Sequence, residues 1–243
     1  MESSSQTTRC FPHPNRTLVI MAKAPKPGKV KTRLMEGLPS PAVTALYRCL
    51  LEDTISLAKS LTSVEVAVMC PEPDRDELAH LFGNTVSVVA QQGEGLASAL
   101  NSVFCHFTAA RQQHVIAFNS DSPHLARSVL DRAFEILTTH DVVVGPTHDG
   151  GYYLVGAKTA HASLFENNSM GTRSALDRLL TRTKSLALST GFTEPFYDID
   201  VTTDLLLLRR ELSLAPAKAP KTAGWFGEWQ QAVAEVRQEL GDP

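Results

Sequence analysis

Residues 18–34 read Leu18-Val19-Ile20-Met21-Ala22-Lys23-Ala24-Pro25-Lys26-Pro27-Gly28-Lys29-Val30-Lys31-Thr32-Arg33-Leu34. Four apolar residues open the segment, and residues 23–33 then carry five cationic side chains around two prolines and a glycine. A short apolar run bounded by such a loop is typical of a buried strand. The segment therefore predicts a first strand that ends in a cationic strand-to-helix turn.

Beyond this segment, short apolar runs alternate with longer stretches of helical period. Further strands are expected at residues 64–69, 86–89, 115–118, 142–144, 152–155 and 196–199. Helices are expected at residues 41–60, 74–81, 96–110, 125–137, in a stretch running through 180, and at 225–240. This alternation predicts an α/β fold in which helices cover both faces of a mostly parallel sheet.

The amino-acid composition indicates how many domains to expect and which partners to exclude. The 243 residues are 43% apolar and 20% charged, which is enough for one substantial core and predicts a single domain. The net charge of −3 argues against nucleic acid or an anionic membrane as a partner. Four cysteines without C-x-x-C spacing favour reduced thiols, and we expect a cytoplasmic protein.

The chain is expected to divide into three parts. The Ser/Thr/Pro-rich residues 1–16 lack the apolar stretch of a secretory signal and are predicted to be a disordered leader. Residues 17–213 form the predicted α/β domain. Residues 214–243 hold a Pro-containing linker and a helix whose aromatic side chains are expected to pack on that domain.

The cationic turn is the first candidate site, because ligands of α/β sheets bind beyond the carboxyl ends of the strands. Lysine supplies a point charge and arginine a bidentate fork, which together suit a polyphosphate. We expect Lys23, Lys31 and Arg33 to contact phosphates, with Ala22 and Gly28 supplying backbone. The alternative is a solvated surface loop. A Walker motif is absent from the sequence.

Carboxylates follow two other predicted strands. Asp121 comes at the end of Val115–Phe118, and a carboxylate there suits Mg²⁺ or Mn²⁺. Asp198 and Asp200 share one face of a strand if residues 196–199 are extended, so Asp200 is a candidate second ligand. The alternatives are that Asp121 caps a turn before the next helix and that Asp200 caps a helix beginning at Val201.

A third candidate site lies in Gly145–Tyr153, where paired glycines follow an acidic residue. Asp149, Gly150 and Gly151 allow backbone to lie against a substrate. The same glycines can equally make a plain hairpin turn.

Taken together, these motifs resemble the bacterial selenodomain-associated transferases of the DUF2064 family, which are similar to the MobA-like molybdenum-cofactor and 2-phospholactate nucleotidyltransferases. The residues that carry the resemblance are 21–34, 120–123, 145–154 and 198–200. The resemblance extends from residue 18 to about residue 205. It implies a GT-A or Rossmann-like fold in one nucleotide-binding domain.

The resemblance also implies roles for individual residues. Asp121 matches the aspartate that holds the metal in GT-A enzymes, and Asp200 matches the later aspartate that completes the site. Ser120 lies beside the metal ligand, and residues 91–96 match a stretch near the nucleobase, so Ser120, Gln92 and Gly93 are expected nucleotide contacts.

The chain departs from the family's usual residues at two positions on the expected acceptor side. His124 stands where the family often has an acidic or small polar residue. Met170 lies near a position that often carries tryptophan. We expect both to line the substrate side, which leaves the acceptor open.

The leading hypothesis is nucleotidyl transfer from a nucleoside triphosphate to a small phosphorylated acceptor, with Mg²⁺ or Mn²⁺ as the cofactor and pyrophosphate as the product. Lys23, Lys31, Arg33 and Asp121 would carry the chemistry, since positioning and charge supply most of the acceleration in such transfers. The alternatives are glycosyl transfer from a nucleotide-sugar and a non-catalytic nucleotide-binding protein. The oligomeric state is open, with a homodimer among the alternatives.

Overall fold

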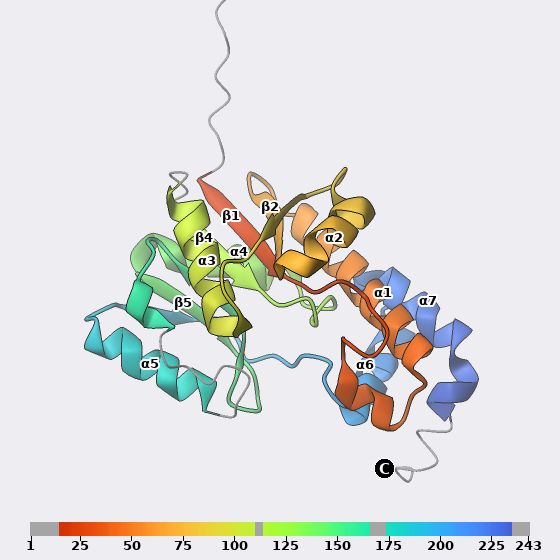
Figure 1. Cartoon of the computed structure of the whole chain (residues 1–243). Coiled ribbons are helices and arrows are strands. Elements are labelled where there is room, and N and C mark those ends of the chain that lie inside the picture. Colours follow the sequence, from red (N-terminus) through yellow and green to blue (C-terminus); the bar gives the residue numbers. More distant parts are fainter. Residues whose placement is uncertain (1–14, 110–113, 166–173, 235–243) are drawn as a thin grey trace, which may run out of the picture.

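The structure is a computed structural model that describes residues 15–109, 114–165 and 174–234. Over these residues, seven strands form one sheet in the order β3-β2-β1-β4-β6-β5-β7 (Figure 1). The strands are β1 (Arg16–Met21), β2 (Glu65–Cys70), β3 (Ser87–Ala90), β4 (His114–Phe118), β5 (Val142–Pro146), β6 (Tyr152–Ala157) and β7 (Thr190–Phe192).

Helical segments connect these strands. The α-helices are α1 (Ser40–Lys59), α2 (Arg75–Phe82), α3 (Gly95–Ala109), α4 (Arg127–Thr139), α5 (Ala175–Ser185), α6 (Thr202–Leu214) and α7 (Pro220–Glu228). Short 3-10 turns are η1 (Thr32–Glu36), η2 (Glu72–Asp74), η3 (Ala162–Leu164) and η4 (Pro216–Lys218). Within the described residues, no helix has both the length and the apolar content needed to cross a bilayer.

The order of the strands fixes where a ligand can enter. β1 pairs in parallel with β2 on one side and with β4 on the other, with Ile20 opposite Phe118 near the carboxyl ends. The chain first builds outward from β1 through β2 to β3 and then returns to place β4 on the opposite side of β1. Such a reversal leaves a crevice beyond the carboxyl ends of the two central strands, which is where α/β sheets bind ligands.

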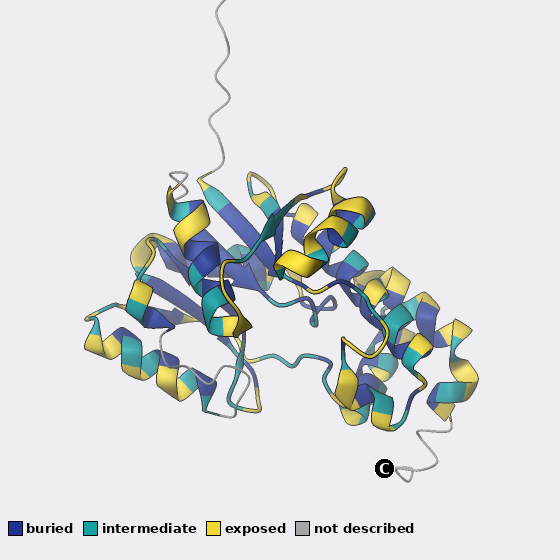
Figure 2. Cartoon of the chain, viewed as in Figure 1, coloured by how far each residue is buried: buried dark blue, intermediate teal, exposed yellow. Residues whose placement is uncertain are grey.

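Alternate side chains of the strands build two separate cores, one on each face of the sheet. On β1, Leu18 and Ile20 pack with α2, α4 and the second half of α1, whereas Val19 packs with α3 and α5. This is the period of two that a strand buried on both faces requires. Figure 2 shows buried residues along the strands and exposed residues on the outer surfaces of the helices.

A third core holds the C-terminal helices against the first half of α1. Leu46 and Leu50 of α1 pack in this core with Leu208 of α6 and Trp225 of α7. The indole of Trp225 also donates a hydrogen bond to the carbonyl of Ala42 at 3.0 Å. The helices α1, α6 and α7 therefore gather beside the sheet (Figure 1).

The structure differs from the sequence expectation late in the chain. Residues 196–199 do not form a strand, and only an isolated bridge joins Phe196 to Thr147. The seventh strand is instead Thr190–Phe192, which contains a glycine and no apolar run. A Cβ on Gly191 would lie 2.3 Å from Ile136, so the glycine allows α4 to pack against this strand. Close packing between elements was not visible in the sequence.

The expected ends of the chain also shift. β1 begins at Arg16, which the sequence assigned to the leader, and residues 1–14 of that predicted leader lie outside the described residues. α7 begins at Pro220 rather than at Trp225, because proline is favoured in the first turn of a helix.

Candidate functional site

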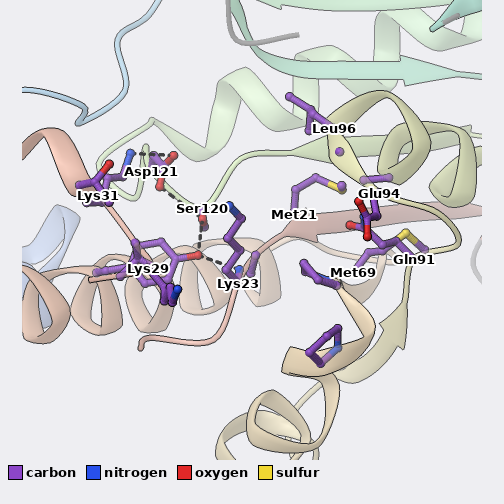
Figure 3. Close-up of a pocket in the computed structure, with 18 of the residues that line it drawn as sticks. Met21, Lys23, Lys29, Lys31, Met69, Gln91, Glu94, Leu96, Ser120 and Asp121 are labelled. Carbon is purple, nitrogen blue, oxygen red and sulfur yellow. Dashed lines mark hydrogen bonds and ion pairs between the residues drawn. The ribbon is translucent and has the colours of Figure 1, made fainter. Parts of the chain in front are cut away.

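A cavity of about 900 Å³ opens beyond the carboxyl ends of β1, β2 and β4. Its wall takes residues from the cationic turn after β1, from η2 after β2, from the loop after β3 and from the turn after β4. Figure 3 shows lysines and Asp121 at one end, and Met21, Met69, Gln91, Glu94 and Leu96 at the other. The cavity therefore has a charged end and a largely apolar end.

Lys31 is the centre of the charged end. Its ammonium lies 2.9 Å from Asp121 and 2.8 Å from Asp200, and its side chain is 7% exposed. Burial alone would lower the pKa of Lys31, but the two carboxylates outweigh it and raise the pKa above its usual value. The residue adopts a left-handed backbone conformation with φ 48°, which is uncommon outside glycine, asparagine and aspartate. This conformation turns the chain directly into η1.

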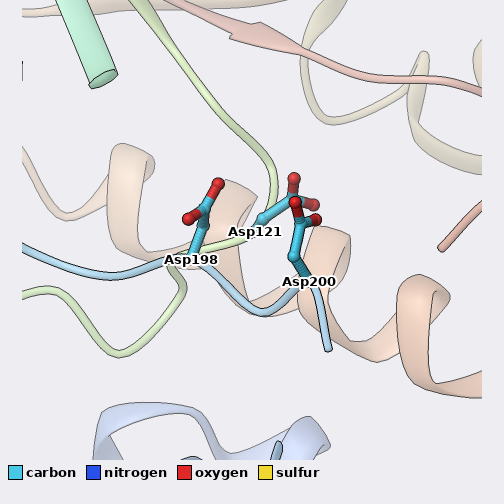
Figure 4. Close-up of side chains that lie close together, drawn as sticks. All are labelled: Asp121, Asp198 and Asp200. Carbon is cyan, nitrogen blue, oxygen red and sulfur yellow. The ribbon is translucent and has the colours of Figure 1, made fainter. Parts of the chain in front are cut away.

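Three carboxylates lie together at this end of the cavity. Asp121, Asp198 and Asp200 each offer an oxygen within 4.8 Å of the others (Figure 4). Burial and the two neighbouring carboxylates raise the pKa of Asp198 to about 6. Burial also acts to raise the pKa of Asp200, but Lys31 and Arg33 outweigh burial and hold it below its usual value. Three oxygen donors on two separate segments have the chemistry of a hard divalent-cation site.

The loop that carries Asp198 and Asp200 is shaped by Asp204. Its carboxylate accepts the backbone N–H groups of Asp200 at 3.0 Å and Val201 at 2.9 Å, ahead of α6. The sequence left open whether Asp200 caps this helix. Since α6 begins at Thr202 with Val201 at its N-cap, Asp200 does not cap the helix, and its carboxylate faces Lys31 instead.

A hydrogen-bond relay joins the cationic turn to Asp121. The backbone N–H of Lys23 donates to the hydroxyl oxygen of Tyr47 at 3.0 Å, and that hydroxyl lies 3.2 Å from the hydroxyl of Ser120. Ser120 in turn donates to Asp121 at 3.3 Å. Because Tyr47 accepts from Lys23, its proton is available for Ser120, and the relay then runs in one direction toward the carboxylate. Burial and Asp121 raise the pKa of Tyr47 to about 12, so the phenol stays neutral.

Most of the nucleotide and metal residues expected from the sequence lie in the wall of this cavity. They are Ala22, Lys23, Lys31, Arg33, Gly93, Ser120, Asp121 and Asp200. Gly28 and Gln92 belong to the same loops but are not part of the wall, and the backbone N–H of Gln92 donates to Ser102 at 2.8 Å.

The expected substrate residues lie elsewhere. His124 is 1% exposed and packs against the rings of Phe196 and Tyr197, which stack on each other. Asp149 accepts hydrogen bonds from Thr147 and from the backbone of Gly151, within the turn that joins β5 to β6.

The geometry of that turn is the plain hairpin that the sequence left open, with Gly150 at φ 91°. None of His124, Asp149, Gly150 and Gly151 lines the cavity, and Met170 lies outside the described residues. Their contact with a substrate therefore stays a prediction.

Sequence reasoning missed Tyr47, Gln91 and Glu94 and named Asp198 without giving it a ligand role. Tyr47 is in the middle of α1 and has the spacing of a core residue, so the sequence held no signal for it. Glu94 and Gln91 lie next to the predicted Gln92 and Gly93, and only the geometry of the loop shows which of the four residues line the cavity.

The family that the motifs resemble also matches part of this chain in a comparison with known families. Residues 54–172 match the model of a family described as "uncharacterized protein conserved in bacteria (DUF2064)". No curated protein sequence matches this chain.

The fold is shared with solved structures. A "putative nucleotide-diphospho-sugar transferase" from Desulfovibrio desulfuricans G20 is 23% identical with a TM-score of 0.83, over 92% of this chain and 97% of that one. A nucleotidyl transferase from Methanothermobacter thermautotroptrophicus is 18% identical with a TM-score of 0.53, over 82% and 97%. A cytidylyltransferase from Leptospira borgpetersenii is 15% identical with a TM-score of 0.53, over 92% and 97%. These similarities confirm the GT-A or Rossmann-like α/β fold.

Proposed function

We propose that this chain, matched over residues 54–172 by the DUF2064 family model, is a metal-dependent nucleotidyltransferase. It moves a nucleoside monophosphate from a triphosphate to a small phosphorylated acceptor. One observation carries the proposal: a single cavity at the switch point of the sheet combines the cationic side chains of the first turn with Asp121 and Asp200. Nucleotidyl transfer needs this pairing, because cations must offset phosphate charge while a carboxylate holds the metal.

In the proposed reaction, an oxygen of the acceptor phosphate forms a bond to the α-phosphorus, and the bond from that phosphorus to the β-bridging oxygen breaks. Pyrophosphate leaves with the bonding electrons. Lys23, Lys31 and Arg33 offset the charge on the β- and γ-phosphates, where it increases as the bond breaks. No proton transfer is needed if the acceptor phosphate is already ionised, so the lack of a nucleophilic triad in the cavity is no objection.

A divalent cation fits the residues present. Asp121, Asp198 and Asp200 supply oxygens only, which suits Mg²⁺ or Mn²⁺, and phosphates and water can complete the shell. When bound, the metal would polarise the phosphate oxygens. Lys31 is the cation that balances these carboxylates in the structure, so a metal must share them with Lys31 or displace its ammonium toward the phosphates.

Glycosyl transfer from a nucleotide-sugar is the second candidate. It is favoured by the structural similarity to the Desulfovibrio protein, which has the highest of the TM-scores given above. The same metal and cations would then hold a diphosphate leaving group. Against it stands the number of cations: Lys31 and Arg33 pair with the candidate metal ligands, and Lys23 and Lys29 add two further positive charges to the cavity wall that have no ion pair within the described residues. This charge suits a triphosphate better than a metal-chelated diphosphate.

A thermal-shift panel separates the two candidates without knowledge of the acceptor. Four nucleoside triphosphates and the common UDP-, GDP- and dTDP-sugars are tested with and without Mg²⁺. A ligand present at 100 times its Kd stabilises the native state by about 2.7 kcal/mol, a shift of several degrees for a chain of this size. We expect one triphosphate to exceed its diphosphate and every sugar nucleotide in the presence of Mg²⁺. A sugar nucleotide that exceeds its triphosphate would assign a glycosyltransferase.

The metal assignment has its own test in Asp121→Asn. The substitution removes a charge from the cation site with almost no change in volume, so we expect the Mg²⁺-dependent part of the triphosphate's thermal shift to be lost. Because Asp121 also pairs with the buried Lys31, the melting temperature without ligand should fall as well, and circular dichroism checks that the fold is kept. A Mg²⁺-dependent shift equal to that of the unaltered protein would refute the assignment.

A further inference from the structure

The apolar end of the cavity has room and surfaces for a flat ring. Met21, Met69, Leu96 and Ala99 line it, and Leu96 is 44% exposed although it is a large apolar side chain. Methionine sulfur packs well against aromatic rings. A nucleotide whose phosphates lie against the lysines would thus extend its base toward this end (Figure 3).

Two hydrogen-bond acceptors stand beside these apolar residues. The amide nitrogen of Gln91 donates to the carbonyl of Gly93 at 3.0 Å, which fixes the orientation of the amide and leaves its oxygen as an acceptor. Glu94 lines the cavity, is exposed, and takes part in no ion pair or hydrogen bond within the described part of the chain. The other glutamate that lines the cavity, Glu72, lies 3.7 Å from Arg75.

A carboxylate selects among the four bases by the order of donors along their hydrogen-bonding edge. Guanine presents a ring N–H and an amino group side by side, which together match the two oxygens of one carboxylate. Adenine and cytosine place an acceptor nitrogen next to their amino group, and uracil flanks its single N–H with two carbonyls. In each of these three bases one carboxylate oxygen would face an acceptor, so binding to Glu94 would be weakened.

We infer that Glu94 is a specificity-determining residue that selects a guanine nucleotide, with its carboxylate accepting both guanine donors. The inference rests on the proposed function in one respect, since it needs a nucleotide in this cavity. It goes further by naming the base, which neither the sequence motifs nor the fold indicates.

The test compares GTP with inosine triphosphate, which lacks only the 2-amino group of guanine. Binding is measured by calorimetry in Mg²⁺ with the full chain, together with ATP, CTP and UTP. We expect GTP to bind about tenfold more tightly than inosine triphosphate, the value of one charge-assisted hydrogen bond, and at least tenfold more tightly than the other three.

Two variants connect the preference to Glu94. In Glu94→Gln, an amide nitrogen replaces one carboxylate oxygen and opposes a guanine donor, so the ratio of GTP to inosine triphosphate affinity should fall to within twofold of unity. Glu72→Gln is the matched control, because it removes the same charge from the same wall at a carboxylate that Arg75 already engages. It should leave the ratio unchanged. Circular dichroism of both variants checks that they are folded.

The outcomes separate this inference from the proposed function. If ATP, CTP or UTP binds as tightly as GTP, or if Glu94→Gln keeps the tenfold ratio, Glu94 does not select guanine, while nucleotidyl transfer remains open. If no triphosphate binds to folded protein, the proposed function fails and the inference fails with it.

Discussion

The ammonium of Lys31 lies between two carboxylates that are also the candidate metal ligands. A buried charge of this kind is stable only because its partners are charged too, and removing one member leaves the others uncompensated. The same lysine is therefore a counterion in the free protein and a candidate phosphate contact in the complex. A substitution that removes the charge of Lys31 should therefore raise the affinity of the free protein for a metal and lower its turnover.

Lys31→Met keeps the length of the side chain and removes its charge. Without the competing ammonium, the carboxylates should bind Mn²⁺ several times more tightly in the absence of nucleotide. At the same time, turnover should fall, because the transition state loses about 2 to 4 kcal/mol of stabilisation. That is the range measured when a preorganised donor is deleted. Electron paramagnetic resonance of free Mn²⁺ measures the affinity for Mn²⁺.

Lys29→Met is the control, because Lys29 is an exposed lysine of the same loop, and it should leave the affinity for Mn²⁺ unchanged. Equal Mn²⁺ affinity in Lys31→Met and the unaltered protein would contradict the counterion role.

Tyr47 acts on the same carboxylate through its hydroxyl. Tyr47→Phe fills the same space but breaks the relay, so Ser120 loses a donor and the N–H of Lys23 loses its acceptor. Groups that orient a metal ligand contribute 10- to 100-fold in metal affinity or activity, and we expect a loss of about tenfold in Mn²⁺ affinity.

Tyr153→Phe is the control for this prediction, because Tyr153 is a buried tyrosine whose hydroxyl bonds Thr193 and Glu194 instead. It should cost stability without changing Mn²⁺ affinity. If both variants lower Mn²⁺ affinity equally, the effect of Tyr47 is only structural.

At the scale of elements, α7 begins without a side-chain cap of its own. Its first free N–H groups, at Lys221 and Thr222, donate instead to Asp53 of α1 at 3.1 and 2.8 Å. The hydroxyl of Thr222 adds a third hydrogen bond at 2.8 Å. Burial raises the pKa of Asp53, although the bonds from Thr222 oppose the shift. A carboxylate of one helix thus caps another that is 168 residues away in the sequence.

Asp53→Ala leaves these donors buried and unpaired, so we expect a loss of about 1 to 3 kcal/mol in the free energy of unfolding. Urea denaturation measures it. Glu52→Gln is the neighbouring control, since Glu52 makes surface ion pairs with Arg48 and Lys221 that should contribute less than about 1 kcal/mol. An equal loss in both variants would mean that Asp53 does not cap α7.

The same elements explain how far the sequence could predict the site. Lys23, Lys31 and Asp121 were found because each follows an apolar strand run, and the carboxyl ends of parallel strands meet at one edge. Tyr47 and Asp53 were not found, because their partners come from distant elements and nothing in the local pattern of α1 separates them from ordinary helix residues. Asp198 and Asp200 were paired by assuming a strand. The structure brings them together through an irregular loop that Asp204 holds.

On the scale of the whole molecule, His124 lies where the turn after β4 meets the segment that precedes the carboxylate loop. Its ring is 4.8 Å from Phe196 and 4.7 Å from Tyr197, and neither ring nitrogen has a hydrogen-bond partner among the described residues. Burial and, to a smaller extent, the positive charge of Lys218 together lower the pKa of His124 to about 3. The other titratable group in contact is Tyr197, whose hydroxyl donates to Glu211 at 2.8 Å. His124 is therefore neutral in the folded protein at ordinary pH.

In the unfolded chain, the pKa of His124 is near 6.5. Between about pH 6.5 and pH 3, the unfolded state therefore binds a proton at His124 that the folded state does not. This contribution to stability is fully present above pH 6.5 and is lost as the pH falls, by at most about 1.4 kcal/mol per pH unit. His124→Phe keeps a ring against Phe196 and Tyr197 and cannot titrate, so its free energy of unfolding should fall less steeply between pH 6.5 and 4.5 than that of the unaltered protein. Urea denaturation at several pH values measures both slopes, and His148→Phe, at a position outside this cluster, should retain the steeper one. Parallel slopes for His124→Phe and the unaltered protein would mean that His124 is protonated in the fold, with water or a rearranged carboxylate beside its ring.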